Sequence, residues 1–170
     1  MIKQMAQDSQ KDQRRVISIL VEDQFGVLQR VCGVFSRRGF NIESLTVSRT
    51  EQDCVSRMTV VSVGDDDNVE QVIKQLNKLV DVIRVSELER DCIASEVMIA
   101  KIHAADFSSR GEIINFTGIY GGKIADTKPK TMTVELAGNA ARLDEFLALV
   151  KPFGIKELVR TGAVAMSRNA

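Results

Sequence analysis

The chain has 170 residues, of which 44% are apolar, and its 23 lysines and arginines equal its 23 aspartates and glutamates. This length fits one ordinary domain or two small ones, and the apolar content is ample for a packed core. The balanced charge removes the broad positive field that is typical of a dedicated nucleic-acid-binding protein. We therefore expect small molecules or other proteins as partners, and no nucleic acid.

The N-terminus and the cysteines bear on where the protein works. Residues 1–13 are polar and carry acids, without the apolar core of a signal peptide, so we expect a disordered tail. No apolar run approaches the ~20 residues that cross a bilayer. Cys32, Cys54 and Cys92 form no CxxC pair and are odd in number, which is typical of free thiols in a reducing compartment. These features predict a cytoplasmic protein without a membrane association.

The first half of the sequence alternates between two hydrophobic periods. Ile17, Ile19 and Val21 have the period of a strand, whereas the spacing from Val27 to Phe35 is that of a helix with one buried stripe. The predicted elements are a strand at 15–22, a helix from 27 that ends at Gly39, strands at 42–49 and 57–63, a helix that is capped by the acidic run 65–67 and extends to 79, and a strand at 82–88.

The second half repeats this plan. The predicted elements are a strand at 97–103, a helix near 112–120, strands at 123–126 and 131–137, a helix at 140–151 and a strand at 155–159. A short repeated motif supports a duplication, because Met58-Thr-Val60 followed by Gly64 matches Met132-Thr-Val134 followed by Gly138. The fold class is therefore α+β, with two ferredoxin-like βαββαβ domains in tandem and a boundary in the charged stretch 89–95.

Each predicted sheet has helices on one face only, so its other face needs a cover. On the first sheet we expect Val16, Leu20, Met58 and Val60 to point away from the helices. Leaving such apolar area in water costs ~25 cal/mol per Å2. We therefore expect two copies of the chain to pair through their sheets.

The turn between the first strand and the first helix predicts a small amino-acid pocket. The free N–H groups of a helix start hold a carboxylate, and Gly26 lets a ligand come close because it has no Cβ. The side-chain oxygens of Asp23 and Asn41 can accept hydrogen bonds from an ammonium group. Structural alternatives remain for all three: Gly26 eases a tight turn, Asp23 is an ordinary turn residue, and Asn41 is a loop residue with positive φ.

The same residues carry a resemblance to a known family. Glu22-Asp23, Gly26-Val-Leu28 and the run from Arg37 to Val47 resemble an ACT domain. With the segments 75–85 and 160–168, nearly everything after residue 14 resembles the small regulatory subunit of acetohydroxyacid synthase, also called acetolactate synthase.

This resemblance implies an ACT domain over residues 14–89, a second ferredoxin-like domain over 96–170, and a homodimer in which valine or another branched-chain amino acid binds between paired ACT domains. It also implies that this chain has no catalytic residue, metal or cofactor of its own. Carried over by motif, the effector site consists of Asp23, Gly26, Val27 and Leu28 of one copy, facing Asn41 and Ile42 of the other.

The resemblance also implies a partner, the large catalytic subunit that carries thiamine diphosphate, magnesium and flavin. The small subunit is expected to activate it and to confer feedback inhibition by valine in branched-chain amino-acid biosynthesis. The alternative is a free-standing ACT-type amino-acid sensor that regulates transcription or another metabolic enzyme. An enzyme on this fold is disfavoured, since His103 has no nucleophile at a recognisable spacing.

Overall fold

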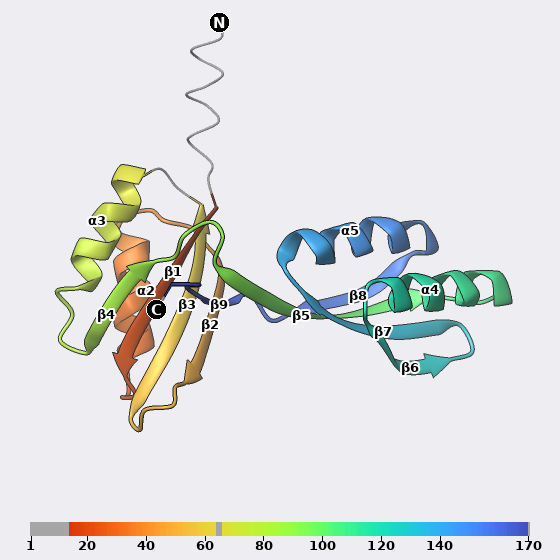
Figure 1. The fold of residues 1–170 in the computed structure, drawn as a ribbon, viewed down its shortest axis with the longest axis horizontal. Helices are drawn as coiled ribbons and strands as arrows, with labels where there is room; N and C mark the ends of the chain where they lie inside the picture. Colours follow the sequence, from red (N-terminus) through yellow and green to blue (C-terminus); the bar gives the residue numbers. More distant parts are fainter. Residues whose placement is uncertain (1–13, 64–65, 170) are drawn as a thin grey trace, which may run out of the picture. The chain divides into compact units, whose positions relative to one another are not determined.

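The computed structural model describes residues 14–63 and 66–169, which form two compact units (Figure 1). The first unit holds the described residues up to Ile93 and again those from Ala163 onward, and the second holds Ala94–Gly162. The predicted tail at 1–13 and the predicted capping role of the acidic run 65–67 lie outside the described residues and side chains. The domain boundaries 14–89 and 96–170 stay predictions.

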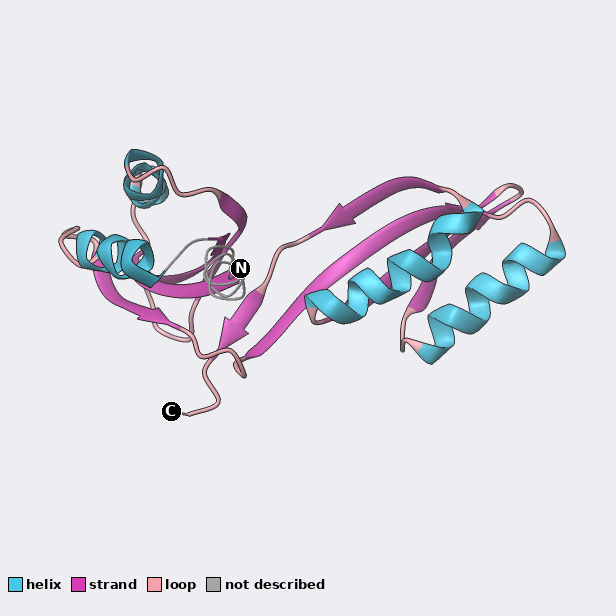
Figure 2. Cartoon of the chain, turned by 90° about the horizontal axis from the view of Figure 1, so that it is seen from above, coloured by secondary structure: helices cyan, strands magenta, loops and turns pink. Residues whose placement is uncertain are grey.

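The first unit has the predicted βαββαβ order. Its antiparallel sheet has the strand order β2-β3-β1-β4, and its two helices cover one face of that sheet (Figure 2). This arrangement confirms the ferredoxin-like fold. The elements are β1 (Arg14–Glu22), α2 (Val27–Arg37), β2 (Ile42–Arg49), β3 (Val55–Val63), α3 (Asp66–Leu76) and β4 (Val82–Glu87).

Helix α2 is held to this sheet by one apolar stripe and is closed by a defined C-terminal motif. Leu28 lies outside this stripe and is 44% exposed. At the other end Gly39 adopts a φ of +71° and its N–H donates to the Ser36 carbonyl, while the Phe40 N–H donates to the Phe35 carbonyl. This pair of bonds is a Schellman motif, so Gly39 ends the helix as predicted. The buried stripe consists of Val27, Val31, Val34 and Phe35.

The face of the first sheet that lacks helices differs from the prediction. Met58 and Val60 pair with Ile19 and Ile17 and belong to the buried core beneath the helices, so their expected outward orientation is wrong. The cause is that β3 carries apolar residues on both of its faces, Met58 and Val60 on one and Val61 and Val63 on the other, so the period alone does not decide which residues face inward.

A ninth strand, which the sequence analysis missed, belongs to this first unit. β9 (Val164–Met166) contacts β1, and Ala163 and Ala165 beside and within it are buried. Only three residues long, this strand is too short to show a period in the sequence.

The second unit repeats the architecture with the strand order β6-β7-β5-β8. Helix α4 begins at Phe107, earlier than the predicted Glu112, because Asp106 caps it by accepting hydrogen bonds from the Ser109 N–H and hydroxyl at 2.9 and 2.7 Å. The elements are β5 (Ile93–His103), α4 (Phe107–Ile119), β6 (Lys123–Lys128), β7 (Thr131–Gly138), α5 (Ala140–Val150), a 3-10 turn (Lys151–Phe153) and β8 (Ile155–Arg160).

Candidate functional site

The turn from β1 into α2 is fixed by backbone hydrogen bonds on both sides. The Glu22 N–H donates to the Asp81 carbonyl at 2.9 Å, and the Asp23 N–H donates to the Cys54 carbonyl at 2.8 Å. The turn is thereby tied to the segment before β4 and to the hairpin between β2 and β3. Its backbone is positioned before any ligand arrives, which lowers the entropy cost of binding.

Gly26 is the N-cap of α2, with φ +80° and ψ −4° and no side-chain cap. This left-handed backbone is by itself sufficient reason for a glycine at position 26. The same geometry leaves the helix start without a capping oxygen. The N–H groups of Leu28 and Gln29, in the first turn, have no acceptor within the helix and remain available to an anion.

Arg30 places a positive charge beside this helix start. Its Nε donates to Asp81 Oδ2 at 2.7 Å, and its Nη1 lies 3.1 Å from the position that a Cβ on Gly26 would occupy. Arg30 was not among the site residues predicted from the sequence. Its only signal was the four-residue spacing from Gly26, which puts both residues on one helix face.

Asp23 lies at the rim of the turn rather than inside it. Its carboxylate forms an ion pair with Arg49 Nε at 3.3 Å, and both side chains are exposed. An exposed pair of this kind contributes little, because solvent screens it and both side chains lose entropy. Asp23 can therefore exchange Arg49 for an ammonium group at small cost.

Two other predicted residues in this turn face in opposite directions. The Val27 side chain is buried in the core, and its N–H donates to the Gln24 carbonyl at 3.4 Å, so only its backbone borders the turn. Leu28 faces outward, and Phe25 beside it is fully exposed. Leu28 and Phe25 give the outer side of the turn an apolar surface.

Asn41 and Ile42 lie at the opposite end of α2 from Gly26. An 11-residue helix is about 16 Å long, so one copy of the chain does not bring these two groups together. Asn41 is exposed, and its backbone carbonyl accepts from the Ser62 hydroxyl at 2.8 Å. Cys54 is the one non-glycine residue with positive φ in the described ranges, so the alternative of a positive-φ loop asparagine at Asn41 is wrong.

The described part of the chain has neither a cluster of metal ligands nor a membrane-spanning helix. No group of three or more histidine, cysteine, aspartate or glutamate side chains is placed to hold a metal ion there. None of the helices in residues 14–63 and 66–169 is long and apolar enough to span a membrane.

Comparison with known proteins identifies the family. A model for the "AHAS small subunit-like ACT domain" matches residues 17–84, and one for the "Small subunit of acetolactate synthase" matches residues 95–169. The probable acetolactate synthase small subunit of Methanothermobacter thermautotrophicus is 51% identical over 91% of this chain and 93% of its own length. The chain belongs to the acetolactate synthase small-subunit family.

Further relatives of this small-subunit family extend the match to bacteria and to a solved structure. The Escherichia coli acetolactate synthase isozyme 3 small subunit is 47% identical over 92% of this chain and 96% of its own length. The crystal structure of the Thermotoga maritima small subunit superimposes with a TM-score of 0.82 at 32% identity, covering 91% of this chain and 96% of that one. The fold is therefore a tandem of ferredoxin-like domains, of which the first is an ACT domain.

Proposed function

We propose that this chain is the regulatory subunit of an acetolactate synthase, which activates the catalytic subunit and confers feedback inhibition by valine. The observation that carries the proposal is the β1–α2 turn. In a chain of this family, it presents an uncapped helix start beside the Arg30 guanidinium and next to exposed apolar side chains. Such a turn suits the carboxylate and the aliphatic body of a branched-chain amino acid.

Each end of the ligand has a partner in this proposal. The carboxylate accepts from the N–H groups of Leu28 and Gln29, and Arg30 adds a favourable charge. The ammonium group donates to the Asn41 carboxamide and to Asp23. The aliphatic side chain packs against Leu28 and Ile42, where one methylene changes the affinity by only ~1–3 kcal/mol.

The proposed site requires a homodimer. Gly26 and Asn41 lie at opposite ends of α2, so a second copy must supply the missing half of each site. A two-fold axis repeats the arrangement and completes two equivalent sites per dimer. The fully exposed Phe25 ring supports this assembly, because a partner copy would remove it from water.

Chemistry belongs to the catalytic subunit in this proposal. That partner carries thiamine diphosphate, magnesium and flavin and works in the cytoplasm, whereas the small subunit binds it and contributes no reactive group. Valine binding is coupled to the distant active site. Such a coupling free energy is typically ~1–3 kcal/mol, which is enough for several-fold inhibition.

Reconstitution tests the proposal. The purified chain is mixed with its catalytic subunit, and acetolactate formation is measured while valine is titrated. We expect a stable complex with higher activity than the catalytic subunit alone and a fall in activity as valine rises. Valine binding to the chain without any complex would favour the free-standing sensor, and the absence of both would overturn the assignment.

A further inference from the structure

The solvent face of α4 carries apolar side chains that the core of the second unit does not use. Ile113 faces the core and is buried, whereas Phe107 is 94% exposed and Ile114 is 52% exposed. Since successive helix residues are about 100° apart, four residues fall within a sector of about 60°. We call this set the α4 stripe: Phe107, Gly111, Ile114 and Gly118.

The two glycines of the α4 stripe have no function within their own unit. Apart from the backbone of α4 and the adjoining residues, a Cβ at Gly111 or Gly118 would meet no described atom within 4 Å, and neither residue has a positive φ. Glycine inside a helix is less stable than alanine, so each of these residues weakens α4 without a packing reason in the unit itself. Small residues let a second helix approach closely, because interaxial distance depends on the side chains at the contact.

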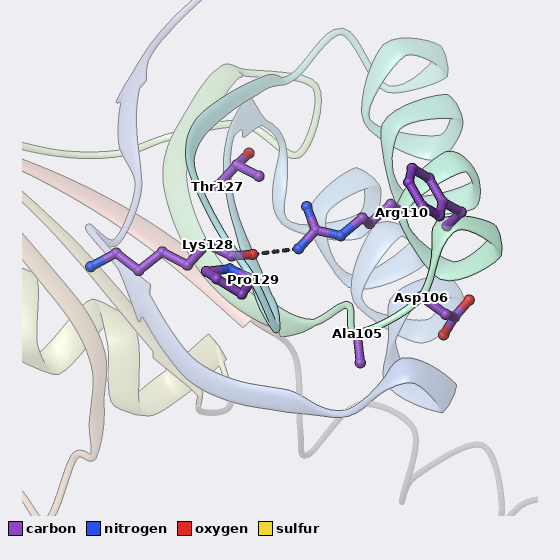
Figure 3. A pocket seen from close by; sticks show the side chains of 7 residues that line it. Ala105, Asp106, Arg110, Thr127, Lys128 and Pro129 are labelled. Carbon is purple, nitrogen blue, oxygen red and sulfur yellow. Dashed lines mark hydrogen bonds between the residues drawn. The ribbon is translucent and has the colours of Figure 1, made fainter.

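A hollow of about 470 Å3 adjoins the N-terminal end of the α4 stripe, between α4 and the β6–β7 turn (Figure 3). Arg110 reaches across it and donates to the Lys128 carbonyl, while the Lys128 side chain points away. The Asp106 carboxylate is occupied by Ser109. In the described ranges no carboxylate forms an ion pair with Arg110, so the lining of the hollow combines apolar side chains (Ala105, Phe107 and Pro129) with the Arg110 guanidinium and the separate Asp106 carboxylate.

We infer that the α4 stripe docks a helix of the catalytic subunit, which places a carboxylate against Arg110; this inference rests on the proposed function. A second copy of the chain matches the surface less well. Parallel pairing of two α4 helices brings Arg110 against Arg110. Antiparallel pairing, with Phe107 of one copy against Gly118 of the other, brings Arg110 opposite Asn115, in the stretch 113–117, which includes no acid. The surface therefore fits a different, acidic partner.

Larger side chains at the two glycines test whether a helix of the catalytic subunit approaches α4 closely there. Gly111→Gln combined with Gly118→Gln is expected to raise the melting temperature of the small subunit, because glutamine is the better helix former. The same change is expected to weaken binding to the purified catalytic subunit at least tenfold in calorimetry. Ser108→Gln is the matched control, because it adds similar bulk to α4 about a quarter turn from the stripe, and it should bind like the wild type.

A charge reversal tests the role of Arg110. Arg110→Glu is expected to weaken binding to the catalytic subunit and to reduce the loss of affinity that added salt causes in the wild type. Lys151→Glu changes the same charge after α5 of the same unit and should leave both quantities unchanged.

The outcomes separate this inference from the proposed function. A wild-type chain that does not bind the catalytic subunit defeats both. If the wild-type chain binds the catalytic subunit and the glycine variants bind it with an affinity within twofold of the wild type, only the docking at the α4 stripe is defeated. The same holds if Ser108→Gln weakens binding as much as the glycine variants do. Loss of the homodimer in the glycine variants would show that the occupant is a second copy and would overturn the assignment.

Discussion

Gly26 is the residue at which backbone geometry and ligand chemistry meet. Its positive φ is unfavourable for most side chains but is tolerated best by asparagine and aspartate. Gly26→Asp would add a carboxylate beside the Arg30 guanidinium and the free N–H groups of the first helical turn. The added carboxylate would satisfy the groups that we assign to the ligand and repel the carboxylate of valine.

Gly26→Asp is therefore expected to abolish valine inhibition while the activation of the catalytic subunit persists. Gly26→Asn is the matched control, because it adds nearly the same volume in the same backbone region without the charge. We expect it to weaken valine binding less, and both affinities are measured by calorimetry together with the inhibition of the reconstituted enzyme. Unchanged inhibition in Gly26→Asp would defeat the assignment of the site.

At the scale of an element, the Asp106 cap makes the start of α4 sensitive to acid. Hydrogen bonds from the Ser109 N–H and then from its hydroxyl hold the pKa of the Asp106 carboxyl below its ordinary value. In the unfolded chain an aspartate has a pKa of about 3.9. Because the pKa of Asp106 is lower in the folded state, its ionised form stabilises the fold fully at pH values above about 3.9. This stabilisation is lost as the pH falls through the lower pKa of the folded state.

This linkage predicts that the NMR shift of the Ser109 amide follows a titration below the ordinary aspartate pKa. Asp106→Asn keeps an oxygen acceptor for the cap but removes the titration, so its Ser109 amide should show a flat profile over the same range. A wild-type transition at or above the ordinary value would contradict the role of the cap.

The elements also show which signals a single sequence contains. The hydrophobic period predicted both βαββαβ units, and Gly39 was recognised because a glycine that ends a helix follows directly after the helical spacing in the sequence. Met58 was placed on the wrong face because, in a strand that is apolar on both faces, the alternation of side chains does not show which face points to the core. Arg30 was missed because its position beside Gly26 depends on Asp81, which is distant in sequence.

At the scale of the whole molecule, the last residues of the chain belong structurally to the first unit. Ala163 and Ala165 are buried there, β9 contacts β1, and the Arg168 Nε donates to the Asp91 carbonyl. The ACT unit is thus completed by residues that follow the second unit in sequence. A fragment that ends before Ala163 would lack part of the first unit, so the two halves of the sequence are not two self-contained pieces.

The alternation of β9 provides a test of this closure within the full-length chain. Ala165 is buried whereas Val164 is half exposed, so a carboxylate at position 165 must be desolvated and one at 164 remains in water. We expect Ala165→Glu to lower the free energy of unfolding by about 2–3 kcal/mol, within the range for burying an unpaired charge. Hydrogen exchange should locate the loss at the β1 amides, with Val164→Glu as the matched control. Faster exchange confined to the second unit would show that β9 does not stabilise the ACT unit.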